Sequence, residues 1–244
     1  MAEVKFCGLT RGVDAALGAS LGAAYLGVIF ASGPRLRSAS EARALFEAAA
    51  SAGAARRVGV FGSQSAADII STARDAGLDV VQLHEAGDPA VVREIRRHFG
   101  GEVWRVLRLP RSLQDAPGDA TRLARRELPP RARRDSVADA AYVAALQICD
   151  EGVDALVVDA LVPGVTGGTG VALDWELLAA AIDRAGRPKR LVLAGGLRPD
   201  NVGRAMALVA PDVVDVSSGV ESAPGIKDHG MMRVFAAAAA RGGQ

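Results

Sequence analysis

Eight short apolar runs recur along the chain, and segments with helical spacing of apolar residues lie between them. The runs are rich in β-branched residues and begin near Val4, Tyr25, Arg57, Val80, Val103, Ala155, Arg190 and Val213. The intervening amphipathic segments include Ser40 to Ala52, Ser65 to Ala76 and Pro89 to His98. Strands that are apolar on both faces and alternate with helices are typical of parallel sheets with crossover helices. Eight such units in 244 residues predict an α/β fold, a single-domain (β/α)8 barrel spanning residues 1–244.

The fifth unit is longer than the others. Most strand starts lie about 21 to 35 residues apart, whereas 52 residues separate Val103 from Ala155. The surplus predicts an arginine-rich insertion at about residues 111–134. It fits a solvated loop with a short helix around Ala120 to Glu127, or a basic lid over an anionic substrate, since this loop leaves the catalytic end of the barrel.

Composition narrows the range of partners. The formal net charge is +1, which gives no reason to expect nucleic acid or an acidic surface as partner and favours a small-molecule substrate. The two cysteines are too few for a disulfide framework, which favours a reducing compartment. No apolar segment approaches the length that spans a bilayer. We therefore expect a cytoplasmic protein with no membrane partner.

Three glycine-rich stretches follow or cap apolar runs late in the chain. They are Gly167-Gly168-Thr169-Gly170, Ala194-Gly195-Gly196 and Ser217-Ser218-Gly219. Glycine and small hydroxyl residues at the end of a strand let backbone N–H groups turn toward an anion. Many (β/α)8 barrels bind phosphate with the loops after strands 7 and 8. The three stretches together predict a phosphate-binding cup.

Side chains at the carboxyl ends of barrel strands converge on one pocket, which singles out Cys7, His84 and Asp159. A thiol and a carboxyl on opposite walls can serve as an acid–base pair, although an isolated cysteine is also a common small buried hydrophobe. Asp159 ends an apolar run, where a carboxylate is costly unless it faces a polar pocket. His84 is expected in the pocket wall. Arg35, in the loop after the second strand, is either a surface residue or a binder of a carboxylate group on the substrate.

A buried ion pair is predicted beneath this pocket. Lys5 shares strand parity with Cys7, and Asp215 shares parity with Ser217 on the strand that closes the barrel. Neither charge can lie inside a barrel uncompensated, so we expect Lys5 and Asp215 to pair. A nearby ammonium would also favour the thiolate form of Cys7.

Several motifs resemble one family. They are Lys5-Phe6-Cys7-Gly8-Leu9-Thr10, Gln82-Leu83-His84, Gly167-Gly168-Thr169-Gly170 with Asp174-Trp175, Leu193-Ala194-Gly195-Gly196-Leu197 through Asn201-Val202, and Val214-Asp215-Val216-Ser217-Ser218-Gly219-Val220-Glu221. Together they are similar to the phosphoribosylanthranilate isomerases of tryptophan biosynthesis, over the whole chain. The family usually has a serine before the proline–arginine pair, where Gly33 stands in this chain. The fifth unit also exceeds the usual family length.

The resemblance implies an Amadori rearrangement of N-(5'-phosphoribosyl)anthranilate to 1-(2-carboxyphenylamino)-1-deoxyribulose 5-phosphate. By analogy, Asp159 is the general acid and Cys7 the general base. Arg35 would bind the anthranilate carboxylate. Backbone groups around five residues would bind the phosphate; these are Gly168, Gly195, Gly196, Ser218 and Gly219. The resemblance implies no metal and no organic cofactor, and it leaves open whether the protein is a monomer or a homodimer.

Three alternatives remain open at this point. A Schiff-base aldolase would need a pocket lysine, and of Lys5, Lys189 and Lys227 only Lys5 has a suitable place in the chain. A related sugar isomerase of histidine biosynthesis would more naturally carry an aspartate in place of Cys7. A phosphosugar-binding barrel without turnover would not require both proton-transfer groups, and this chain carries both.

Overall fold

A computed structural model describes residues 1–84, 89–110, 152–161 and 173–242. Its centre is a closed barrel of eight parallel strands in sequential order, with β1 pairing both β2 and β8. The strands are β1 (Glu3–Phe6), β2 (Tyr25–Ile29), β3 (Arg56–Phe61), β4 (Val80–Leu83), β5 (Glu102–Pro110), β6 (Ala155–Leu161), β7 (Leu191–Leu193) and β8 (Val213–Val216). The predicted (β/α)8 barrel is confirmed, and each strand begins within one residue of its predicted start.

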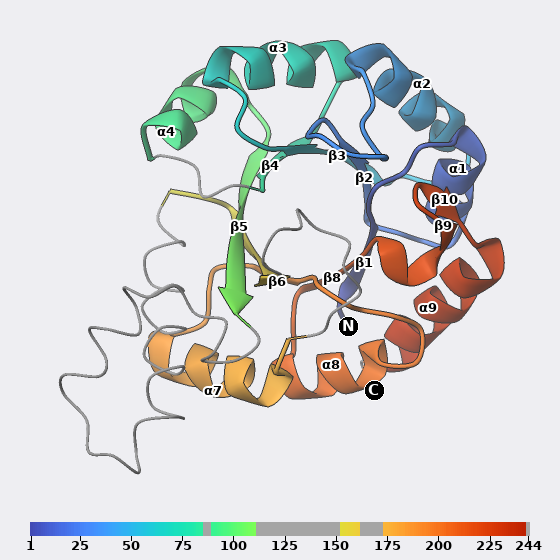
Figure 1. Cartoon of the computed structure of the whole chain (residues 1–244), viewed down its shortest axis with the longest axis vertical. Coiled ribbons are helices and arrows are strands. Elements are labelled where there is room, and N and C mark those ends of the chain that lie inside the picture. The colour runs from blue at the N-terminus through green and yellow to red at the C-terminus, as the bar shows by residue number, and fades with distance from the viewer. Residues whose placement is uncertain (85–88, 111–151, 162–172, 243–244) are drawn as a thin grey trace.

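Helices form a ring outside the barrel (Figure 1). They are α1 (Gly12–Ser20), α2 (Ala39–Ala50), α3 (Ala66–Ala76), α4 (Pro89–His98), α7 (Trp175–Ala185), α8 (Val202–Val209) and α9 (His229–Arg241). Local sequence sets their ends. Ser38 and Glu41 form a capping box at the start of α2, and Ser65 caps α3. Gly77, at φ 67°, ends α3 in the left-handed conformation that glycine adopts without strain.

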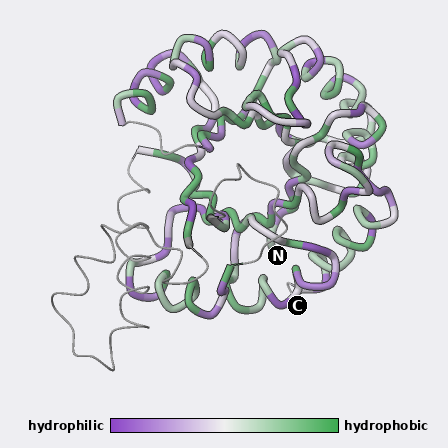
Figure 2. Tube along the Cα trace, viewed as in Figure 1, coloured by the Kyte–Doolittle hydropathy of each residue, from purple (hydrophilic) through white to green (hydrophobic). Residues whose placement is uncertain are grey.

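The apolar residues form two layers. Strand residues that point outward pack against the helices, and those that point inward fill the barrel. Figure 2 shows the strands and the inner faces of the helices as mostly hydrophobic. At the amino-terminal end of the barrel, the rings of Tyr25 and Trp104 meet edge to face with centroids 4.8 Å apart. This packed lower layer leaves the opposite end of the barrel free to form a pocket.

Two short elements follow β8. The 3-10 helix η1 (Ser218–Val220) leads into an antiparallel hairpin of β9 (Glu221–Ala223) and β10 (Ile226–Lys227). Sequence periodicity did not predict this hairpin, because its strands are too short to show a pattern.

The insertion predicted at about residues 111–134 and its short helix lie outside the described residues, as does Gly168. The assignment of residues 1–244 to one domain with that insertion stays a prediction. In the part of the chain that the structure describes, none of the helices has the length and apolar character needed to cross a membrane.

Substitution of Trp104 tests how much the packed layer at the amino-terminal end of the barrel contributes to stability. The side chain is fully buried, so Trp104→Ala should lower the free energy of unfolding by about 3–5 kcal/mol through lost burial and the cavity left behind. Chemical denaturation followed by circular dichroism measures the change. The matched control is Val234→Ala on an exposed position of α9, which should change stability by less than about 0.5 kcal/mol. Equal effects of the two substitutions would contradict the assigned packing.

Candidate active site

A cavity of about 380 Å³ opens at the carboxyl ends of the strands. Its lining includes the sequence-predicted residues that the structure describes, namely Cys7, Arg35, His84, Asp159, Gly195, Gly196, Ser218 and Gly219. Asp159 lies in β6, Cys7 and His84 directly follow β1 and β4, and the others lie in the segments after β2, β7 and β8. The parallel order of the strands brings them together, because every strand ends at the same rim.

Cys7 directly follows β1 and is 7% exposed. Its backbone N–H donates to the carbonyl of Val216 at 2.9 Å, which continues the β1–β8 ladder by one residue. Burial raises the pKa of the Cys7 thiol, and the ammonium of Lys5 opposes part of that rise. Burial thus favours the neutral thiol, and Cys7 can act as a base only as the thiolate, after it has lost its proton.

The predicted ion pair beneath the pocket is confirmed. Lys5 and Asp215 are register partners across the β1–β8 seam, and Lys5 Nζ donates to Asp215 Oδ2 at 2.7 Å. Burial alone would lower the pKa of Lys5, but the Asp215 carboxylate and Cys7 together outweigh this effect, so the pKa of Lys5 lies above its ordinary value. Burial raises the pKa of Asp215, and Lys5 opposes that rise. We assign the charged pair, because the raised pKa of Lys5 keeps the ammonium protonated.

Asp159 lies near the end of β6, and His84 directly follows β4. His84 Nε2 and Asp159 Oδ2 are 3.8 Å apart, and both side chains are partly exposed to the cavity. Asp159 Oδ1 accepts a hydrogen bond from the backbone N–H of Ala160 at 2.8 Å. Gly195 lies against this carboxylate, since a Cβ atom there would come within 2.6 Å of Asp159 Oδ1. The loop after β7 thus packs directly on the β6 carboxylate.

The loops after β7 and β8 present backbone N–H groups at the rim. Gly195 and Gly196 have φ values of 80° and 65°. Asn201 fixes their loop, because its Nδ2 donates to the carbonyl of Gly196 at 2.9 Å. Within the described residues, the backbone N–H groups of Gly195, Gly196, Ser218 and Gly219 donate to no backbone carbonyl. Such groups are suited to bind an anion.

Arg35 is held by Glu221, for which the sequence predicted no role. Its Nε and Nη2 donate to the two oxygens of Glu221 at 2.9 and 2.6 Å. Gly33 stands where the family usually has serine, and its φ of 118° lies in the region that favours glycine. Lys227 lies beyond the glycine-rich stretches in chain order, yet its buried ammonium donates to Glu221 Oε1 at 2.8 Å and to the Ser217 carbonyl at 3.0 Å. Lys227 lies close to Ser217 and Glu221 because the hairpin after β8 returns the chain to the rim of the barrel.

Among the described residues, no group of three or more His, Cys, Asp or Glu side chains is arranged to hold a metal ion. The expectation that the protein needs no metal and no organic cofactor stays a prediction.

Comparison with known proteins decides the family. The family model described as N-(5'-phosphoribosyl)anthranilate (PRA) isomerase matches residues 4–130 and 119–238. The chain belongs to the PRA isomerase family. Its activity is therefore PRA isomerisation in tryptophan biosynthesis.

Individual PRA isomerases match over nearly their whole length. The enzyme from Acidithiobacillus ferrooxidans is 36% identical over 97% of each chain. A monomeric form of the dimeric isomerase from Thermotoga maritima superimposes with a TM-score of 0.73 at 28% identity, covering 99% of this chain and all of the other. Another PRA isomerase structure, with a TM-score of 0.69 at 27% identity, covers 99% of this chain and 100% of the other. That enzyme holds reduced 1-(o-carboxyphenylamino)-1-deoxyribulose 5-phosphate.

Substitutions in the Lys5–Asp215 pair test how the buried ion pair affects the stability of this PRA isomerase. Lys5→Met leaves an unpaired carboxylate inside the barrel and should lower the free energy of unfolding by about 3–5 kcal/mol. The double variant Lys5→Met/Asp215→Leu removes both charges and should recover much of that loss. Denaturant unfolding measures both. Arg204→Met, which removes an exposed pair with Glu176, is the control and should change stability by less than about 1 kcal/mol. No recovery in the double variant would contradict the pairing argument.

Proposed function

We propose that Cys7 and Asp159 carry out the proton transfers of the isomerisation. Asp159, in its acid form, gives a proton to the furanose ring oxygen as the C1–O bond breaks and a Schiff base forms at C1. The Cys7 thiolate then removes the C2 proton and leaves an enolamine. Addition of a proton at C1 and loss of the C2 hydroxyl proton complete the ketose amine. Two groups with different environments suit these opposite tasks.

The single observation that supports this assignment is that one cavity is lined by a thiol, a carboxyl group and the glycine-rich backbone of two successive loops. In this proposal the backbone N–H groups of Gly195, Gly196, Ser218 and Gly219 bind the phosphate. Gly168 belongs to the same proposed set, although it lies outside the described residues. The relative with the reduced product analogue holds a ligand that carries a phosphate and a carboxylate. Arg35 would bind that carboxylate, since a guanidinium matches its planar geometry.

His84 would form the pocket wall beside Asp159 and donate a hydrogen bond to the carboxylate or the substrate. Lys5 does not serve as a Schiff-base amine in this proposal, because its pairing with Asp215 keeps it protonated. A small phosphorylated substrate is the proposed partner, with no nucleic acid or membrane involved. We further infer a cytoplasmic location, and either a monomer or a homodimer, the second because a relative is dimeric.

Substitution of the two proposed proton-transfer residues tests the roles. Cys7→Ser and Asp159→Asn should each reduce kcat by at least about 100-fold, because each removes one positioned acid or base. The assay follows the loss of PRA fluorescence with time. Circular dichroism confirms that the fold is retained, and Asp200→Asn at an exposed position is the control. Undiminished activity in either variant would overturn the role of that residue.

The pH profile tests the state of Cys7. Burial raises the pKa of the Cys7 thiol, so in most molecules of the free enzyme Cys7 is in the thiol form at neutral pH. The value of kcat/KM should therefore increase as the pH rises toward that pKa. Lys5→Met removes a charge that lowers the thiol pKa, so the ascending limb should move to higher pH. Measurement of kcat/KM for both proteins in a constant-ionic-strength buffer series gives the comparison. A shift to lower pH would contradict the proposed influence of Lys5.

A further inference from the structure

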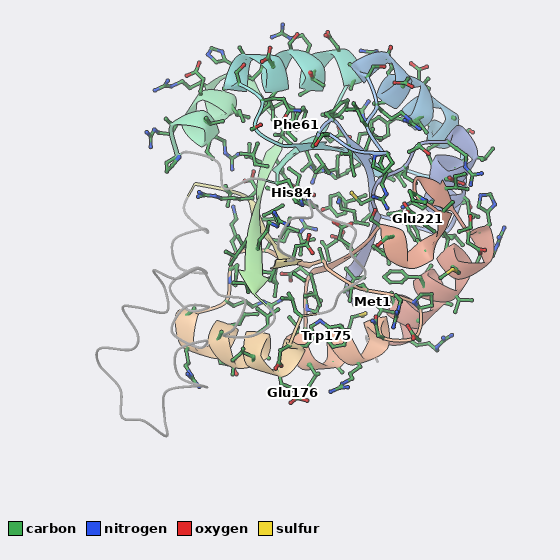
Figure 3. All side chains as sticks on the ribbon, viewed as in Figure 1. Met1, Phe61, His84, Trp175, Glu176 and Glu221 are labelled. Carbon is green, nitrogen blue, oxygen red and sulfur yellow. The ribbon has the colours of Figure 1, made fainter. Side chains whose placement is uncertain are left out.

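The hairpin after β8 carries a buried acidic group that the proton transfers do not use. The Glu221 side chain, at the start of β9, is 4% exposed, and Figure 3 shows it across the barrel from His84. Its carboxylate accepts three hydrogen bonds, two from Arg35 and one from Lys227. Such a concentration of charge-assisted hydrogen bonds on one carboxylate fixes the donors in place.

The geometry restricts Arg35 in a specific way. Glu221 engages the Nε and Nη2 groups at 2.9 and 2.6 Å, so the guanidinium plane is set by two parallel hydrogen bonds. The Nη1 group makes no hydrogen bond to the described residues, and Arg35 lines the cavity. A free arginine would have to lose rotamer entropy on binding an anion, whereas a clamped arginine has already lost it.

The hairpin is itself tied down at several points. Arg11 donates to the backbone carbonyl of Lys227 at 2.9 Å and also binds the buried carboxylate of Asp14 through two hydrogen bonds. His229 Nε2 lies 2.9 Å from the same carboxylate. Thr10 donates to the carbonyl of Gly225. These contacts anchor the hairpin to the β1–α1 side of the barrel, so Glu221 meets Arg35 from a rigid support.

The ionisation of Glu221 is consistent with its pairing with Arg35 and Lys227. Burial alone would raise the pKa of Glu221, but hydrogen bonds from Arg35 and the charge of Lys227 lower it below its ordinary value. Glu221 is therefore ionised at neutral pH. Burial lowers the pKa of Lys227, and the Glu221 carboxylate opposes that fall. With Lys227 protonated, two cations face one carboxylate, and the cluster carries a positive charge that suits an anionic ligand.

We propose that Glu221 is a positioning residue of this PRA isomerase: it presents Arg35 to the substrate carboxylate, with Lys227 holding Glu221 in turn. The proposal rests on the proposed function, in which Arg35 binds that carboxylate. Glu221 does not touch substrate, and its effect passes through the guanidinium. Loss of Glu221 should therefore affect ligands with the carboxylate and spare ligands without it.

The test uses the full-length protein and two ligands, reduced 1-(o-carboxyphenylamino)-1-deoxyribulose 5-phosphate and the same compound without its carboxylate. Isothermal titration calorimetry gives the Kd of each. Glu221→Gln should weaken binding of the first ligand by about tenfold or more, as expected for loss of a charge-assisted contact network, and leave the second within about twofold. With PRA as substrate, KM should rise more than kcat falls. The control is Glu94→Gln on α4, where a partly exposed glutamate also pairs with an arginine; it should change neither Kd nor the kinetic constants.

Two further variants keep the test decisive. Glu221→Asp retains the charge but shortens the side chain, so it should show a smaller loss that is again specific to the carboxylate ligand. Arg35→Lys should lose affinity for that ligand, and adding Glu221→Gln to it should change little more, because both act through one contact. Equal loss for both ligands, additive losses with Arg35→Lys, or unchanged binding in Glu221→Gln would overturn the proposal. A wild-type protein that neither isomerises PRA nor binds the first ligand would instead overturn the proposed function.

Discussion

The seam between β1 and β8 is the constraint on which the rest of the structure depends. A (β/α)8 barrel exists only if the last strand pairs with the first, and here that seam contains a charged pair inside the barrel. A shift by one residue would turn Lys5 or Asp215 out of the interior and leave the other charge buried alone. A one-residue shift is therefore disfavoured by the cost of a buried charge without its partner.

The same register places the chemistry. Cys7 lies two residues beyond Lys5, and Ser217 lies two residues beyond Asp215, so side chains that alternate along each strand put the thiol and the start of the glycine-rich loop on the pocket side. The structural pair and the functional groups occupy successive layers of one barrel. A change at the lower layer would thus be felt at the upper layer through the backbone.

Most of the fold was predictable because it depends on period-two and helical patterns that each segment carries by itself. The pocket membership of Cys7, His84 and Asp159 followed from one rule, that parallel strands end at a common rim. The roles of these residues in proton transfer rest on analogy and stay proposals. The roles of Glu221 and Lys227 were not predicted. They depend on a short hairpin that brings Lys227 back to Ser217, 10 residues earlier in the chain, and on side-chain contacts that no local pattern encodes.

The charges around Cys7 set the equilibrium between its thiol and thiolate forms, and a bound anionic substrate shifts that equilibrium. Arg35, Lys227 and Lys5 all favour the thiolate, while burial and Asp215 oppose it. A carboxylate bound at Arg35 would offset part of the positive charge at the rim, which raises the thiol pKa and makes the thiolate a stronger but less populated base. Lys5 is buried beneath the pocket and its charge is not offset by a ligand at the rim. In this arrangement the charge of Lys5 continues to favour the Cys7 thiolate when substrate is bound. The net charge of the cluster of Arg35, Glu221 and Lys227, in contrast, changes when a carboxylate binds.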